Sequence, residues 1–95
     1  MQKPSIGRIV VIKGYQSNGQ DEHPAIVNCV HGPAGDAITP DPYFMCNTTM
    51  FPDCGLPQSV TSVYVFQTRE QAEGYRERNS GENFKPIVGF FPDRV

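Results

Sequence analysis

Cysteine and histidine side chains are the residues of this chain best suited to hold a metal ion. Cys29-x-His31, Cys46, Cys54 and His23 together carry enough sulfur and nitrogen atoms for a zinc site. Structural zinc sites usually pair their ligands at C-x2-C or H-x3-H spacing, and neither pair occurs in the sequence. We therefore predict no metal and no cofactor, with Cys29 and Cys46 as small core residues.

A cysteine and a histidine could also act together as a nucleophile and its base, with Asp36 or Asp41 orienting the ring. No local signature of such a site surrounds any cysteine. His23 lies in a polar run and His31 ends a predicted strand, where a solvated histidine is the ordinary case. We therefore predict that the protein is not an enzyme.

Arginine and aromatic residues indicate binding rather than catalysis. A ring can stack on a nucleotide base while a guanidinium meets its phosphate. Phe91 stands near Arg94 at the C-terminus, and Arg8 lies among branched aliphatic residues, where it either reaches the rim or points into a pocket. The candidate ligand-binding residues are Arg8, Tyr15, Phe91 and Arg94, with Lys13 and Arg76 in reserve.

The C-terminal residues also have a structural interpretation, which we favour. A terminal aromatic segment often serves to tie a small barrel shut, so Phe90 and Phe91 would be core residues. Arg94 would then pair with Asp93 or with the carboxylate of Val95.

Charge and hydropathy argue against two classes of partner. The net charge is −2, and eight Lys and Arg residues are spread along the chain without a dense cluster, whereas duplex nucleic acid is bound through several phosphate contacts from one basic face. The longest apolar runs, 9–12 and 63–66, are far shorter than a membrane-spanning helix, and residues 1–5 hold no apolar stretch of secretory type. We therefore predict no duplex nucleic acid and no membrane as partner.

Three cysteines are an odd number for a secreted disulfide scaffold, and they show no close pair. We predict a cytoplasmic protein with reduced thiols, and one disulfide stays open as an alternative.

Runs of β-branched and aromatic residues predict the strands. The first covers Gly7–Ile12 and ends at Gly14, because four consecutive β-branched residues favour extended backbone. Residues 15–24 are polar and contain the turn signal Asn18-Gly19, which predicts a protruding loop or a long hairpin tip. Further strands are predicted at Ala25–His31, which Gly32-Pro33 breaks, at Tyr43–Phe51 and at Ser59–Phe66.

One helix and a last strand complete the chain. Thr68 and Gln71 form a capping-box pattern for a helix over Arg69–Arg78, whose thin apolar face should rest lightly on the sheet. A fifth strand, Phe84–Phe91, is interrupted by Pro86. The pattern predicts a single domain over residues 1–95, mainly β, built as a small barrel of about five strands with one short helix between strands four and five.

Both ends of the chain resemble a known family. The opening Lys3-Pro4-Ser5-x-Gly7-Arg8-x-Val10 is similar to that of a family of short bacteriophage and prophage proteins. The close Phe90-Phe91-Pro92-Asp93-Arg94-Val95 resembles the family's ending of aromatic residues before Pro-x-Arg-Val, with phenylalanine where the family usually has tryptophan. The resemblance implies a phage-encoded protein with a Src-homology-3-like barrel, and it implies no established activity.

Two hypotheses follow for a small, non-enzymatic binding protein. In the first, it is an anti-defence protein that sequesters a small nucleotide signal of the host. Because one barrel of this size has little room for a closed pocket, a homo-oligomer would hold the ligand at a subunit interface. In the second, it is an adaptor or inhibitor that docks on a host or virion protein through residues 15–24 or through a sheet edge.

Overall fold

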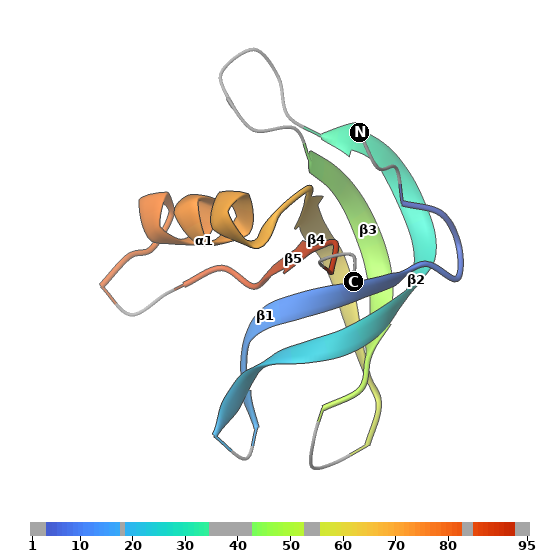
Figure 1. Ribbon diagram of the computed structural model, residues 1–95, viewed down its shortest axis with the longest axis horizontal. Coiled ribbons are helices and arrows are strands. Elements are labelled where there is room, and N and C mark those ends of the chain that lie inside the picture. The colour runs from blue at the N-terminus through green and yellow to red at the C-terminus, as the bar shows by residue number, and fades with distance from the viewer. Residues whose placement is uncertain (1–3, 18, 35–42, 53–55, 83–84, 93–95) are drawn as a thin grey trace.

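A computed structural model of the chain describes residues 4–17, 19–34, 43–52, 56–82 and 85–92. In this part of the chain five strands form a closed barrel in the order β1-β2-β3-β4-β5, and one helix packs beside it (Figure 1). The elements are β1 (Ile9–Ser17), β2 (Gln20–Ala34), β3 (Tyr43–Met50), β4 (Gln58–Phe66), α1 (Arg69–Arg78) and β5 (Val88–Phe90). Strands β1 to β4 pair antiparallel in succession, and β5 lies parallel to β4 and antiparallel to β1. The predicted fold class is confirmed.

The first hairpin is longer than predicted on both sides of its turn. The predicted end of the first strand at Gly14 is wrong, because β1 passes through this residue at a φ of 121° and shifts register between Lys13 and Ser17. The predicted break at Gly32 is also wrong, since β2 continues to Ala34 with Gly32 at a φ of 118°. Both glycines allow an irregularity that bends a strand without ending it. The predicted long hairpin tip is confirmed.

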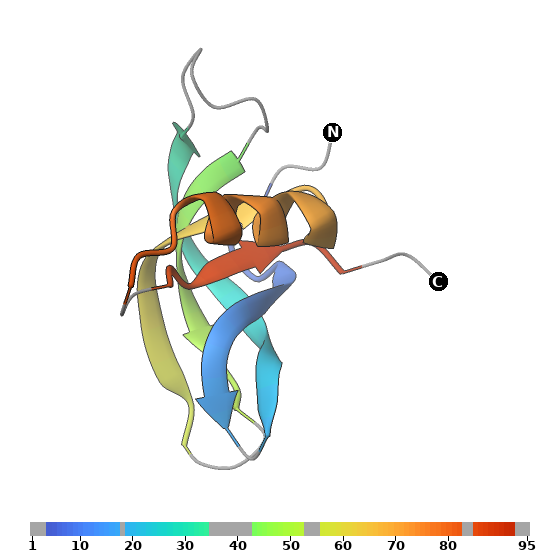
Figure 2. The ribbon, with the colours of Figure 1, turned by 90° about the vertical axis from the view of Figure 1, so that its left-hand side faces the viewer.

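Two apolar clusters hold the barrel together. The first fills its interior and contains Val10, Ile12, Ala25, Val27, Phe44, Cys46, Met50, Val63, Val65 and Phe91. The second lies between the sheet and α1 and contains Tyr43, Phe66, Ala72, Val88 and Phe90. Figure 2 shows α1 lying alongside β5, on the outside of the barrel. The capping box of Thr68 and Gln71 is present and Ala72 is the buried residue of the helix, which confirms the predicted light packing.

The last strand is shorter than predicted. Within the predicted range Phe84–Phe91, β5 covers Val88–Phe90, and residues 83–84 lie outside the described part of the chain. Pro86 has no backbone N–H with which to join a sheet. As a result β5 pairs with β4 at Tyr64–Phe66 and with β1 at Val11–Lys13. Among the described residues, the part of β4 from Gln58 to Val63 pairs with β3 alone.

Candidate functional site

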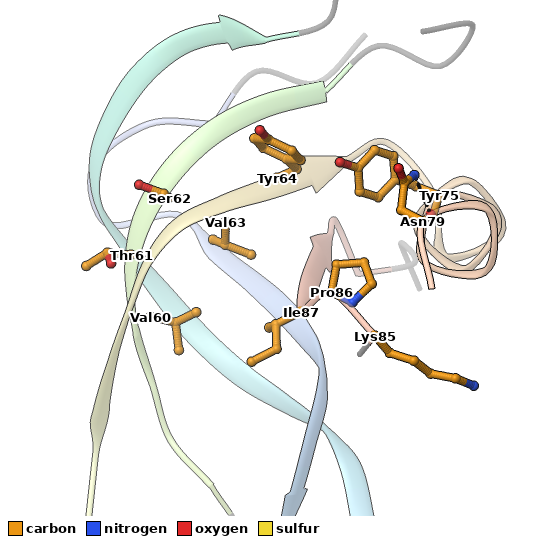
Figure 3. Close-up of a pocket in the computed structure, with 10 residues that line it drawn as sticks. All are labelled: Val60, Thr61, Ser62, Val63, Tyr64, Tyr75, Asn79, Lys85, Pro86 and Ile87. Carbon is orange, nitrogen blue, oxygen red and sulfur yellow. Dashed lines mark hydrogen bonds between the residues drawn. The ribbon is translucent and has the colours of Figure 1, made fainter. Parts of the chain in front are cut away.

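A groove lies beside the first part of β4, before the point where β5 begins to pair with this strand. Its volume is about 550 Å³, and one wall is the stretch of β4 without a second strand partner. The other walls are the segment 85–87 that precedes β5 and the last turns of α1 (Figure 3). The lining residues are Val60, Thr61, Ser62, Val63, Tyr64, Tyr75, Asn79, Lys85, Pro86 and Ile87.

The β4 wall contains a β-bulge. The register moves from Cys46 opposite Val63 to Thr48 opposite Val60, so two residues of β4 face Asn47 alone. Ser62, one of the two, has a φ of 56°, and its N–H donates to Asn47 Oδ1 at 2.9 Å. A left-handed residue other than glycine costs free energy. Bulges and strained residues gather at binding and catalytic sites, which makes this wall the strongest site candidate of the fold.

The opposite wall is held away from β4. The Arg76 Nε atom donates to the Pro86 carbonyl oxygen at 3.1 Å, which ties the segment 85–87 to α1. The same segment lies directly against β1, where a Cβ placed on Gly14 would be 3.3 Å from Ile87 Cα. These contacts fix residues 85–87 against α1 and β1, on the side of the groove opposite β4.

Aromatic side chains form the end of the groove near α1. The rings of Tyr64 and Tyr75 meet edge to face with centroids 5.6 Å apart, and Tyr43 packs on Tyr64 at 4.6 Å. Burial, together with the hydroxyls of Tyr64 and Tyr43, raises the pKa of Tyr75 above its ordinary value. A tyrosine hydroxyl is protonated at neutral pH in any case, and that of Tyr75 can donate a hydrogen bond. Asn79 Nδ2 donates to the Tyr75 carbonyl oxygen at 2.9 Å and holds this end of the helix.

One charged side chain, that of Lys85, belongs to the groove lining in the described part of the chain. Its Nζ lies 3.8 Å from Glu77 Oε1, and the two side chains are 51% and 70% exposed. An exposed ion pair of this kind contributes little to stability. The groove thus combines aliphatic, aromatic and uncharged polar side chains with one lysine at its rim, whose side chain extends away from β4 (Figure 3).

None of the predicted ligand-binding residues that the structure describes lines this groove, although Arg76 braces one of its walls through the Pro86 carbonyl oxygen. The Arg8 guanidinium lies 5.3 Å from the centroid of the Phe91 ring, and Phe91 is 1% exposed. Phe90 is buried under Arg69 in the same manner, at 5.2 Å. The favoured interpretation of both phenylalanines as core residues is confirmed. Arg94 lies outside the described residues.

Lys13 and Arg76 lie together, among carboxylates. They line a shallow hollow of about 300 Å³ with Glu73 and Glu77. Lys13 Nζ lies 3.0 Å from Asp21 Oδ2 and 3.3 Å from Glu22 Oε2. Burial disfavours the Lys13 cation, and these two carboxylates outweigh it, so the pKa of Lys13 is raised. A phosphate would have to compete with both carboxylates.

Tyr15 and His23 form a separate contact. His23 is 2% exposed and its Nε2 lies 2.8 Å from the Tyr15 carbonyl oxygen, so the prediction of a solvated histidine in a polar loop is wrong. The reason is that β2 begins at Gln20, which puts His23 inside the sheet. Tyr15 is half-buried against the core, and its hydroxyl accepts a hydrogen bond from Gln58 Nε2 at 2.9 Å.

The cysteines divide into a buried and an exposed thiol. Cys46 is a core residue as predicted, and burial raises its pKa to about 11. Cys29 is exposed, so its predicted place in the core is wrong, because β2 shifts register between Val27 and Cys29. Cys54 lies outside the described residues. No group of three or more His, Cys, Asp or Glu residues that could hold a metal occurs in the described part.

Sequence reasoning missed the groove itself. Tyr64 and Tyr75 were expected in strand and helix, and Lys85 in the last strand, without any indication that they share a site. The one available signal was Pro86, which marked an interruption of the last strand.

None of the helices in the described residues is long and apolar enough to span a membrane.

No protein-family model matches the chain, and no curated protein or solved structure matches it either.

Proposed function

We propose that the protein is a non-enzymatic binding module that takes an extended segment of a partner protein into the β4 groove. One observation carries the proposal: over Gln58–Val63, β4 has a strand partner on the β3 side alone among the described residues, and this stretch forms a wall of the groove. A strand edge presents N–H and C=O groups that pair readily with another extended chain.

The backbone pattern of the bulge supports a polypeptide as occupant. Val60 O accepts a hydrogen bond from Thr48 Oγ1 at 3.0 Å, and the N–H of Ser62 donates to the Asn47 side chain. Both groups therefore point toward β3. Thr61 lies between them in the groove wall, and we expect its backbone groups to pair with an extended segment.

The side-chain lining supports the same class of ligand. Val60, Val63 and Ile87 lie around the floor of the groove, and two tyrosine rings close one end (Figure 3). Alternate side chains of a bound strand point the same way, so two of them can reach apolar surface. The adaptor hypothesis thus gains a defined sheet edge, and a host or virion protein is the partner that the phage-family resemblance suggests.

Nucleotide capture has weaker support in the arrangement of the described residues. Its two reserve residues, Lys13 and Arg76, stand among carboxylates, and Phe91 is in the core. It is kept as the competing outcome of the experiment.

The test begins with selection from a random peptide display library, followed by titration of an enriched peptide into isotope-labelled protein observed by NMR. Amide shift changes at residues 60–64 and 87 are expected. Methylation of backbone nitrogens in the peptide should abolish binding, because it removes the strand hydrogen bonds. Ile87→Asp should weaken binding, whereas Ile6→Asp, a matched change at a residue 78% exposed and outside the groove, should not. Shift changes confined to other surfaces, no enriched peptide, or saturable heat from nucleotides alone would overturn the proposal.

A further inference from the structure

We infer that Lys85 binds an acidic side chain of the partner segment, and that Glu77 competes with this carboxylate for the same ammonium group. The inference rests on the proposed function, since it specifies the sequence of the segment that the groove accepts. It identifies the ligand as an extended peptide that carries Asp or Glu beside an apolar residue.

Charge complementarity gives the first argument. Lys85 is the charged member of a lining otherwise made of aliphatic, aromatic, hydroxyl and amide side chains, among the residues described. A cation next to apolar surface favours a ligand that places a carboxylate beside it, to the modest extent expected of a half-exposed pair. The neighbouring cation Arg76 is already engaged with the Pro86 carbonyl oxygen at 3.1 Å, so Lys85 is the group that meets the partner's charge.

The geometry of the Lys85–Glu77 pair gives the second argument. The two charged atoms lie 3.8 Å apart, which is longer than a charge-assisted hydrogen bond. Both side chains are largely exposed, and Glu77 lies outside the groove lining while Lys85 belongs to it. An incoming carboxylate can therefore take Lys85 from Glu77 at little cost.

The aromatic end of the groove specifies the neighbouring position of the segment. Tyr75, Pro86 and Ile87 line the groove next to Lys85 and offer an apolar surface with one phenol hydroxyl. An aliphatic or proline side chain of the segment fits this surface, and the acidic residue then falls beside Lys85. The expected recognition element is an apolar residue close to an acidic one.

In the decisive test, substitutions at the two members of the ion pair should change the affinity for an acidic peptide in opposite directions. Lys85→Gln should weaken binding of an acidic peptide by about two- to fivefold. Glu77→Gln should strengthen it by about twofold, because it removes the competing carboxylate. Glu82→Gln removes an exposed carboxylate close in sequence to Lys85 and serves as the matched control for net charge; its effect should be smaller than that of Glu77→Gln.

A charge exchange completes the experiment. The Lys85→Glu variant should no longer bind the acidic peptide, and it should bind a peptide in which Lys replaces the acidic residue. If enriched peptides bind the groove but Lys85→Gln and Glu77→Gln change affinity in the same direction, or if the charge exchange fails to restore binding, the inference is wrong while the proposed function stands. If amidation of the peptide C-terminus, which removes its terminal carboxylate, lowers the affinity as much as Lys85→Gln does, the inference is also wrong. Absence of any peptide bound in the groove overturns both.

Discussion

Ile87 packs against Gly14 so closely that a Cβ on Gly14 would lie 3.3 Å from Ile87 Cα and 3.3 Å from Arg76 Nε. This contact joins β1 to the segment that precedes β5, across the part of the barrel where β5 has not yet begun. The same segment, residues 85–87, forms the wall of the groove opposite β4.

Gly14→Ala should therefore destabilise the protein for two reasons. The residue has a φ of 121°, which an L side chain rarely adopts, and the added methyl group would press on the backbone of Ile87. We expect a loss of about 1–3 kcal/mol in the free energy of unfolding, measured by urea denaturation. Gly19→Ala is the control, since Gly19 has a φ of 80° but nothing within 4 Å of its Cβ position. An equal loss in both variants would show that close packing at Gly14 has no effect.

Ser62→Gly should stabilise the protein, against the usual effect of glycine in a strand. Ser62 has a φ of 56°, where glycine is free of the strain that a Cβ brings. The expected gain is about 0.5–1 kcal/mol, because the greater freedom of glycine in the unfolded chain offsets part of the relief. Ser59→Gly, at a regular exposed position of the same strand, should be destabilising. A loss of stability in both variants would contradict the assignment of strain to Ser62.

Elements that depend on neighbouring residues could be predicted from the sequence, whereas features that depend on contacts between distant residues could not. The helix was predicted to its exact bounds, because Thr68 and Gln71 form a cap that depends on neighbouring residues alone. The third and fourth strands were predicted to within one residue at each end. Two of the errors in β1 and β2 fall at Gly14 and Gly32, since a glycine can end a strand or bend it, and the choice depends on a partner strand far away in sequence.

The groove was beyond sequence reasoning for the same reason. It depends on the register of β4 against β3, which places Asn47 opposite two residues, and on the distance between residues 85–87 and β1. Neither relationship is visible in a run of neighbouring residues. The burial of His23 likewise follows from the extension of β2 back to Gln20.

Acid should weaken the fold partly through Asp21. The hydrogen bond from Lys13 holds the pKa of Asp21 below its ordinary value. A carboxyl group whose pKa is lowered on folding stabilises the protein above its unfolded pKa, about 4, and this contribution is lost as the pH falls through the folded pKa. Asp21→Asn should therefore lower stability at neutral pH, by less than about 1 kcal/mol because the side chain is 32% exposed.

Urea denaturation at several pH values checks this assignment. The stability curves of Asp21→Asn and the parent protein should converge as the pH falls below about 4. The control is Glu70→Gln, at an exposed carboxylate in the first turn of α1. A difference between Asp21→Asn and the parent that is independent of pH would show that the effect comes from packing instead of charge.

The two described cysteines should differ in reactivity, and Cys46 should report on opening of the barrel. Burial raises the pKa of Cys46 to about 11, so its thiolate is scarce at neutral pH and its sulfur lies within the core. Cys29 is exposed on β2.

In a Cys54→Ser background, a thiol reagent at neutral pH should modify Cys29 at once and Cys46 only as fast as the barrel opens. Because Cys46 lies on β3 opposite Val63 of β4, a peptide that adds to the β4 edge should slow its modification further, in proportion to occupancy. Rapid modification of both thiols in the native protein would contradict the closed core, and an unchanged rate for Cys46 under saturating peptide would contradict coupling between the groove and the barrel.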